Sequence, residues 1–300
     1  MAPSQQDFKA IVLGDLHVEE KSLKECQDII TEVCSLRIAS NINTIIQVGD
    51  LCDKNRLNAT ELLELTHMMH QLKSNFEYVY ILEGNHDKQD RNTSIIQYLK
   101  YLGIHVVDDY FVWNNFLFGH WFTDKSTGAF GHYRYTVDEL KEKNYKGVIL
   151  GHQHDPQVID ENIHHIGSAR YTSFGENHKL LKKVGFISND NLTFAALSSP
   201  IPLCKVSSIE ELKSLPDRAK VQYEFKSFTQ LKEEIKTINE LKNRFFSFKK
   251  KNDFVMDIKR NSVSSSPKRD IRDIIQDFLG TIKEAEIKNI LEEEFKGELI

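Results

Sequence analysis

The sequence predicts a layered α/β domain, with a smaller α+β unit and helices after it. Short apolar runs rich in Val, Ile and Phe recur and end in glycine, and segments of helical period separate them. The 300 residues suffice for one domain of about 200 residues and a smaller one. The runs lack alternation of apolar and polar residues, which is typical of strands buried on both faces. They span Phe8–Gly14, Thr44–Gly49, Tyr78–Gly84, Asn115–Gly119 and Lys146–Gly151.

Apolar residues spaced by three or four positions predict helices between these strands. The helical segments are Leu23–Leu36, Asn58–Lys73, Ile95–Leu102 and a short one after the capping box Thr136–Glu139. Asn58 is a suitable cap for the second helix, and Gly103 ends the third. Two later strands, around 184–188 and 192–197, are expected to close the domain.

Residues 1–198 are expected to form this large domain, and residues 199–260 a small α+β capping domain. Prolines and serines near 198–218 indicate a connector. Residues 261–269 would be a linker, and residues 270–300 a helical segment whose apolar stripe either folds back on the core or binds a partner. The capping domain should contain strands at Lys220–Phe225, Phe245–Lys249 and Phe254–Ile258 and a helix at Phe228–Leu241.

The composition is that of an ordinary soluble globular protein, with 40% hydrophobic and 28% charged residues. No apolar run is long enough to span a membrane, and the N-terminus has no signal-peptide pattern. The four cysteines show no CxxC spacing, so we expect a reducing, cytoplasmic location. The net charge of −5 neither favours nor excludes a nucleic-acid partner, because bound cations can supply positive charge locally.

Metal-ligand side chains follow each of the five glycine-ended runs. Because sites assemble outside the carboxyl ends of strands in open α/β sheets, these side chains should meet. The set mixes imidazole, carboxylate and amide groups without thiolate, which disfavours a structural zinc site and suits manganese, iron or catalytic zinc. The five clusters are Asp15-Leu-His17, Gly49-Asp50-Leu-Cys-Asp53, Gly84-Asn85-His86-Asp87, Gly119-His120 and Gly151-His152-Gln-His154.

In order and spacing, these clusters resemble the DxH, GDxxD, GNHD, lone His and GHxH motifs of the calcineurin-like metallophosphoesterases. The resemblance implies their sandwich fold, a capping domain and two divalent metal ions, with manganese expected. By the same resemblance the first metal ligands are Asp15, His17, Asp50 and His154. The second set is Asp50, Asn85, His120 and His152, with Asp50 shared.

The resemblance also implies roles for residues that are not ligands. His86 would donate a proton to the leaving oxygen, and Asp53 would orient His86 or a ligand. We interpret Asp87 as a turn or capping residue. Other histidines are interpreted as surface or core residues: His67, His70, His105, His132, His164, His165 and His178.

The segment after the last metal motif separates members of this class. Ile166-Gly167-Ser168, Phe174-Gly175-Glu176 and Lys183-Val184-Gly185-Phe186 resemble the GS, FGE and KGF signature of SbcD-type repair nucleases, with Val184 as a departure. Gly119-His120-Trp121 and the short chain are similar to the compact tailed-phage members. Asp53-Lys54-Asn55 and Asp87 depart from the Ser/Thr phosphatase pattern.

This resemblance implies a manganese-dependent DNA exonuclease and endonuclease for DNA repair and recombination, in the host cytoplasm if phage-encoded. An SbcC-type ABC/SMC-like ATPase would bind the C-terminal helices. A homodimer would form through the helices around 62–72 and 95–102. Two alternatives remain open: a phosphodiesterase or phosphatase acting on small nucleotides, and a non-enzymatic binding scaffold.

Overall fold

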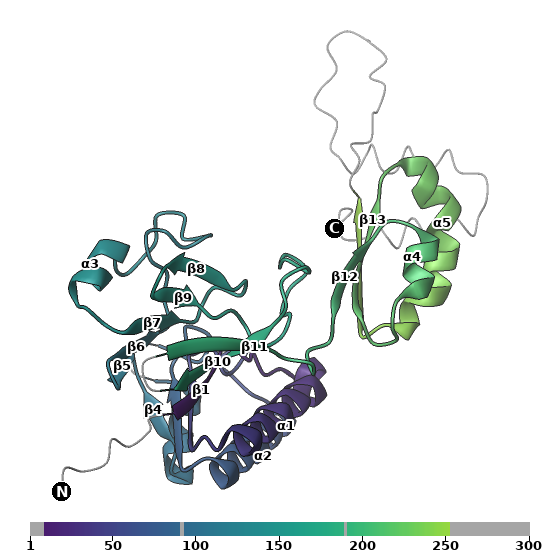
Figure 1. Cartoon of the computed structure of the whole chain (residues 1–300). Coiled ribbons are helices and arrows are strands. Elements are labelled where there is room, and N and C mark those ends of the chain that lie inside the picture. Colours follow the sequence, from purple (N-terminus) through teal and green to yellow (C-terminus); the bar gives the residue numbers. More distant parts are fainter. Residues whose placement is uncertain (1–8, 91–92, 189–190, 253–300) are drawn as a thin grey trace, which may run out of the picture. The chain divides into compact units, whose positions relative to one another are not determined.

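The structure is a computed structural model that describes residues 9–90, 93–188 and 191–252 (Figure 1). The chain divides into two compact units between Ile201 and Pro202, three residues after the boundary expected at 198. The expected linker at 261–269, the helical segment at 270–300 and the strand Phe254–Ile258 lie outside the described residues.

The first sheet of unit 1 has the strand order β11-β10-β1-β2-β3-β4. Strands β1 to β4 run parallel, and β10 is antiparallel to β1. Their bounds are β1 Lys9–Leu13, β2 Thr44–Gln47, β3 Tyr78–Leu82, β4 His105–Val107, β10 Lys183–Ser188 and β11 Asn191–Ala196. The antiparallel pair β10–β11 closes one edge of the sheet, as the sequence predicts.

Helices cover one face of this sheet, and α1 lies beside α2 (Figure 1). The helices are α1 Leu23–Ser40, α2 Ala59–Asn75 and the 3-10 helices η1 Glu20–Ser22 and η2 Ile95–Leu102. Asn58 and Glu61 form a capping box at the start of α2. The segment expected to be a third α-helix is instead 3-10 throughout, and it ends at Gly103, whose φ of 74° suits glycine.

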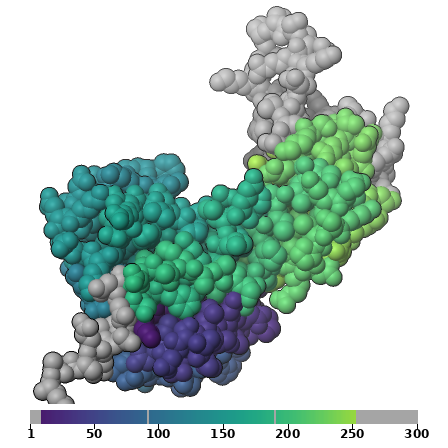
Figure 2. Space-filling model, viewed as in Figure 1, coloured from purple at the N-terminus to yellow at the C-terminus, as the bar shows by residue number. Residues whose placement is uncertain are grey.

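A second sheet packs on the other face of the first, with the order β5-β6-β7-β9-β8. Its elements are β5 Tyr110–Trp113, β6 Phe116–Gly119, β7 Gly147–Leu150, β8 Gln157–Asp160 and β9 Ile163–His165, with α3 Val137–Glu142 on its outer side. Unit 1 is therefore the layered α/β sandwich that the sequence predicts. Figure 2 shows the helices in purple and blue and the second sheet in teal.

Alternate residues of β1 explain why its sequence is apolar throughout. Ile11 and Leu13 pack in the core shared with α1 and α2, whereas Ala10 and Val12 pack against the second sheet. Both faces of the strand are thus buried, and a polar residue would be unsolvated on either side.

Unit 2 has a parallel sheet in the order β12-β13-β14 with helices against it. Its elements are β12 Leu203–Val206, α4 Ile209–Ser214, β13 Lys220–Phe225, α5 Phe228–Leu241, η3 Lys242–Arg244 and β14 Ser247–Asn252. The prediction of a connector at 198–218 is wrong for β12 and α4, because these are regular elements whose residues Leu203 and Leu212 are buried in this unit. None of the helices in the described ranges is long and apolar enough to cross a membrane.

Candidate metal centre

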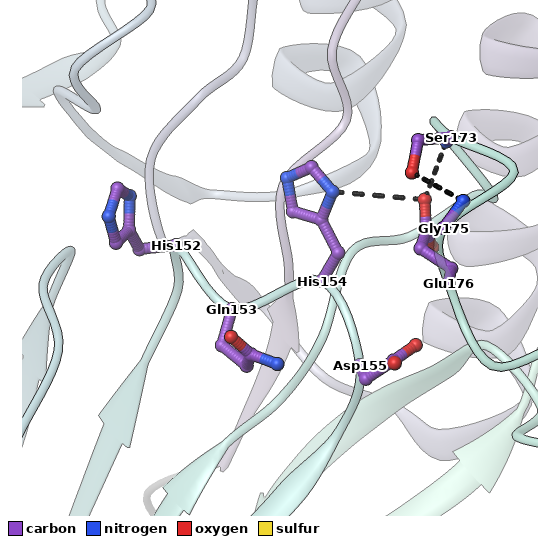
Figure 3. Close-up of a pocket in the computed structure, with 7 residues that line it drawn as sticks. All are labelled: His152, Gln153, His154, Asp155, Ser173, Gly175 and Glu176. Atoms are coloured by element: carbon purple, nitrogen blue, oxygen red, sulfur yellow. Dashed lines mark hydrogen bonds and ion pairs between the residues drawn. The ribbon is translucent and has the colours of Figure 1, made fainter. Parts of the chain in front are cut away.

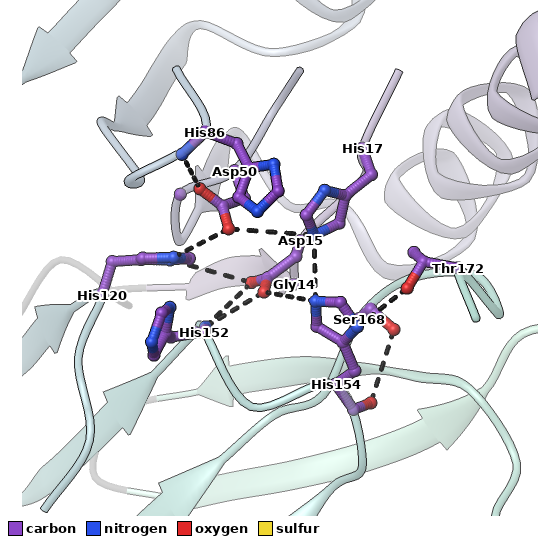
Figure 4. Close-up of polar contacts among 12 residues, drawn as sticks. Gly14, Asp15, His17, Asp50, His86, His120, His152, His154, Ser168 and Thr172 are labelled. Atoms are coloured by element: carbon purple, nitrogen blue, oxygen red, sulfur yellow. Dashed lines mark hydrogen bonds and ion pairs between the residues drawn. The ribbon is translucent and has the colours of Figure 1, made fainter. Parts of the chain in front are cut away.

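The loops after β1, β2, β3, β6 and β7 bring the nine predicted site residues to one place. Figure 4 labels all of these residues except Asp53 and Asn85. The loops are bonded to each other through the backbone. The amides of Leu16 and His17 both donate to the carbonyl of Asp50, at 3.1 and 3.0 Å. The side chains of one loop are therefore held in register with those of the next.

Tight turns aim the ligands towards one another. His17, Asp50 and His152 have φ values of 48°, 50° and 75°, in the left-handed region that residues other than glycine seldom adopt. Such strained backbone persists where the surrounding structure imposes it, and it concentrates at functional sites. At Gly84 the reason for glycine is contact, because a Cβ atom there would overlap the carboxylate of Asp50.

Three lone pairs converge around His120. Its Nδ1 lies 2.8 Å from the carbonyl oxygen of Val48, which can only accept, so Nδ1 carries the proton of the neutral ring. The other nitrogen, Nε2, faces Asp50 Oδ2 at 3.1 Å and Asn85 Oδ1 at 3.3 Å. His152 lies in the same cluster. Oxygen and nitrogen acceptors that face one another fit a divalent cation.

A second convergence lies between His17 and His154, whose Nε2 atoms are 3.0 Å apart. Nδ1 of His154 lies 2.8 Å from Thr172 Oγ1, and that hydroxyl donates its proton to Glu176 Oε1 at 2.8 Å. Thr172 must then accept from His154, so the Nε2 lone pair of His154 is left for a metal. Asp15 completes this cluster, with Oδ2 3.9 Å from that Nε2.

Two buried carboxylates place negative charge at the centre of the site. Asp15 and Asp50 are 0% and 1% exposed. Burial, reinforced by the charge of Asp50, raises the pKa of Asp15 although His120 opposes this. Burial also opposes ionisation of Asp50, but its hydrogen bond with His120 and the His120 charge hold its pKa low. Burial opposes a charge on His120, but the Asp15 and Asp50 carboxylates raise its pKa to about 9. A metal at Nε2 would therefore replace a proton there, and the negative charge of the two carboxylates suits cations.

Asp53 contacts two histidines through different atoms. Its backbone carbonyl accepts from Nδ1 of His86 at 2.5 Å, and its carboxylate lies 3.4 Å from Nδ1 of His17. This contact with His17 lowers the pKa of Asp53. The carboxylate therefore acts on His17, and only the main chain of Asp53 orients His86.

The segment after β9 forms hydrogen bonds that hold His154 on the side away from the metal centre. Glu176 is 5% exposed and accepts from the amides of Thr172 and Ser173, both at 2.7 Å. Lys182 Nζ lies 2.5 Å from Glu176 Oε2 and 2.9 Å from the carbonyl of His154. The buried lysine is Lys182, whereas the sequence comparison placed the signature lysine at Lys183, which is only half-buried.

A cavity of about 260 Å³ opens beside this support (Figure 3). Its lining comes from the last metal motif and from the segment that contains Glu176. The lining residues are His152, Gln153, His154, Asp155, Ser173, Gly175 and Glu176. The site therefore continues past the ligands into a polar recess that a substrate could enter.

Two residues have positioning roles that the sequence did not predict. Arg170, 2% exposed, donates to the carbonyls of Leu16 at 2.8 Å and His17 at 2.5 Å. Asp87 is fully buried and accepts from the amides of Cys52 at 2.8 Å and Gly84 at 2.9 Å. Asp87 thus joins two ligand loops, which is more than a local cap. Arg170 lies in no motif, so no sequence signal marks it.

A site of this composition, at strand ends between two stacked sheets, suits a metal-dependent hydrolase. The family model for calcineurin-like phosphoesterases matches residues 8–183. That span is more than half of the chain, and the chain belongs to this family of phosphoester hydrolases. Metallophosphoesterases use divalent metals, and three groups of side chains are candidate ligand sets. They are Asp15, His17 and His154; Asp50, His120 and His152; and His17, Asp50 and His86.

Solved structures resemble the chain only distantly. One is the crystal structure of Pseudomonas putida nuclease MPE, which is 19% identical to this chain with a TM-score of 0.33. The match covers 52% of this chain and 66% of the nuclease chain, just under two thirds of the nuclease's length. A second crystal structure is 9% identical, with a TM-score of 0.37, over 64% of this chain and 100% of that one. Neither likeness is close enough to assign a substrate. No curated protein matches the chain.

Proposed function

We propose that this chain is the nuclease subunit of an SbcC–SbcD-type DNA end-processing complex, and that it hydrolyses DNA phosphodiesters with two Mn²⁺ ions. Membership of the phosphoesterase family supports phosphodiester hydrolysis. Two cations bound here would supply positive charge to phosphate oxygens and lower the pKa of water towards neutrality. The ligand sets of the proposal are Asp15, His17, Asp50 and His154, and Asp50, Asn85, His120 and His152.

The nuclease assignment rests on the buried side chains that hold His154 in position. The GS and FGE parts of the SbcD-type signature contribute Ser168 and Glu176, and both contact Lys182. The signature thus corresponds to a connected structure at the metal centre. This supports the SbcD-type assignment, because metal motifs alone do not separate the members of the class.

His86 is placed to donate a proton. Its ring is exposed, and its amide donates to Asp50 Oδ1 at 2.9 Å, which fixes the residue at the edge of the metal centre. Since Nδ1 donates to a carbonyl, Nε2 is free to carry a second proton and deliver it to a leaving oxygen. We assign His86 as the general acid.

The partners of the proposal are DNA, an SbcC-type ATPase that binds residues 270–300, and a second copy of the chain. Leu62 and Leu63 of α2 are 40% and 54% exposed, which supports a dimer contact on this helix. A variant that ends at residue 261 should lose ATPase binding and keep metal-dependent cleavage of short DNA.

The function is tested with the full chain, Mn²⁺ and three substrates: duplex DNA, single-stranded DNA and bis(p-nitrophenyl) phosphate. We expect cleavage of DNA and of the small diester, both abolished by EDTA. Hydrolysis of the small diester with both DNAs intact would refute the nuclease assignment and favour a small-nucleotide phosphodiesterase. Metal binding without any hydrolysis would favour a binding scaffold.

A further inference from the structure

The loop between β6 and α3 presents aromatic and basic side chains to solvent. We call residues 123–135 the aromatic loop. Phe130 is 93% exposed and Tyr133 is 49% exposed, and both Lys125 and His132 are exposed on the same loop. Aromatic side chains interspersed with basic ones are the groups that bind single-stranded nucleic acid.

The tip of the loop holds Phe130 in a costly conformation. Phe130 has a φ of 44°, and Gly128 and Gly131 on either side have φ values of 85° and 82°. A bulky residue in the left-handed region is strained, and here no burial of the ring compensates. An exposed and strained phenylalanine indicates a role in binding.

The base of the loop is connected to the metal centre through His165. Its Nδ1 donates to the carbonyl of Gly151 at 2.9 Å, so its Nε2 accepts from Ser126 Oγ at 2.7 Å. Ser126 Oγ in turn accepts from the amide of Thr123 at 2.8 Å. Gly151 directly precedes the predicted ligand His152, so the loop and the metal motif are held together.

Three further contacts hold the loop in place. Gln157 of β8 accepts from the amide of Thr127 at 2.9 Å and donates to the carbonyl of Lys125 at 3.1 Å. The ring of Phe122, the residue just before the loop, packs on the ring of His152 with 4.3 Å between centroids. The loop is thus positioned for a ligand before the ligand arrives.

The tip lies beside the cavity of Figure 3. A Cβ atom at Gly128 would be 3.6 Å from Gln153 Oε1 and 3.9 Å from Cε2 of Phe130. Gln153 lines the cavity between His152 and His154. The ring of Phe130 and the Gln153 side chain of the cavity wall therefore both lie close to Gly128.

Other aromatic residues near this loop are used within the fold. The ring of Trp121 packs on Tyr135 with 5.6 Å between centroids, and the guanidinium of Arg134 lies 4.9 Å from the Trp121 ring. No ring contact involving Phe130 is present in the described part of the chain. The solvent-facing ring is therefore available to a ligand.

We propose that Phe130 stacks on an unpaired nucleobase of a strand whose phosphate lies at the metal centre, with Lys125 and His132 near its backbone. This inference rests on the proposed nuclease function and names single-stranded nucleic acid, or a frayed duplex end, as the substrate. A stack of this kind is independent of sequence because every base has an aromatic face.

The test uses the full chain with Mn²⁺ and two single-stranded oligonucleotides, one normal and one in which the bases next to the cleaved bond are abasic. Wild type should cleave the normal strand with the higher kcat/KM. Phe130→Ala should reduce kcat/KM on that strand about 5- to 150-fold, the loss expected from one base–aromatic stack, and should abolish the preference over the abasic strand. Phe130→Trp should retain the preference.

Ile38→Ala is the matched control, because Ile38 is 66% exposed on α1 and lies outside the aromatic loop, the metal centre and the proposed dimer helices. The control should cleave like wild type. The stacking role is overturned if Phe130→Ala behaves like this control, or if it loses activity equally on both strands. A wild-type protein that cleaves duplex DNA but neither single strand overturns the stacking role alone. Hydrolysis of bis(p-nitrophenyl) phosphate with duplex DNA and both single strands intact refutes the nuclease function itself, and the stacking role with it.

Discussion

The hydroxyl of Thr172 lies 2.8 Å from Nδ1 of His154, and it joins this histidine to the buried carboxylate of Glu176. The arrangement selects the tautomer of His154 whose Nε2 lone pair faces His17. Outer contacts of this kind orient metal-binding histidines, and their loss costs about 10- to 100-fold in metal affinity. The relationship explains why a segment beyond the metal motifs belongs to the site.

Thr172→Val should therefore weaken Mn²⁺ binding about 10- to 100-fold, because it removes the hydroxyl and keeps the shape. Thr172→Ser, which retains the hydroxyl, should bind Mn²⁺ nearly as wild type does. Isothermal titration of metal-free protein with Mn²⁺ measures both. Equal affinity of the Val and Ser variants would show that the hydroxyl does not act on His154.

Asp50→Asn should weaken both metal sites together. Asp50 Oδ2 lies 3.1 Å from Nε2 of His120 and 3.8 Å from Nε2 of His17, so one carboxylate faces both clusters. Wild type should retain two Mn²⁺ ions per chain in elemental analysis after desalting. The variant should retain fewer than one. A single ion in the wild type would contradict the two-site arrangement.

His86→Ala should reduce kcat for hydrolysis about 10²- to 10⁴-fold and leave Mn²⁺ affinity close to that of wild type. The reason is that His86 offers a proton at the edge of the site and is proposed as an acid, outside the ligand set. His105→Ala, at an exposed position of β4, is the matched control and should be fully active. Loss of metal together with activity in His86→Ala would make His86 a ligand instead.

Asp87→Asn should destabilise the fold by about 1 to 3 kcal/mol, because an amide cannot accept every backbone N–H that the buried carboxylate satisfies. Urea unfolding in EDTA measures the change without the contribution of metal. Glu142→Gln, at the exposed end of α3, is the control and should leave the free energy of unfolding within about 0.5 kcal/mol. Equal stability of Asp87→Asn and wild type would remove the proposed link between ligand loops.

Glu32 should give a pH-dependent contribution to stability. Burial opposes its ionisation, but hydrogen bonds from Ser198 and Ser199 hold its pKa below the usual 4.5. Because the folded pKa is depressed, the stabilisation is present above pH 4.5 and is lost as the pH falls through the lowered pKa.

Glu32→Gln measures this contribution by urea unfolding at several pH values. The variant should be less stable than wild type by up to about 1.5 kcal/mol at pH 7, and the difference should shrink below pH 4. A difference that is constant from pH 3 to pH 7 would show that the charge of Glu32 is not the cause.

The sequence by itself determined the strands that carry the site and the residues that follow them. β1, β2, β3, β6 and β7 are buried on nearly every position, and continuous apolar runs report such burial directly. The cap at Asn58 and the box from Thr136 to Glu139 were equally visible, because capping depends on local spacing. The motif order then indicated the family.

Other features depend on contacts between distant residues, and only the tertiary structure decided them. The division of the strands between two sheets, the 3-10 geometry of η2, and β12 in a supposed connector have no local signature. The partner of His154 is Thr172, on a separate loop, and Arg170 holds the His17 loop from over 150 residues away. Local patterns report burial and chain reversal, whereas the proton positions and charge balance of a site are set by whichever groups the fold brings within hydrogen-bond distance.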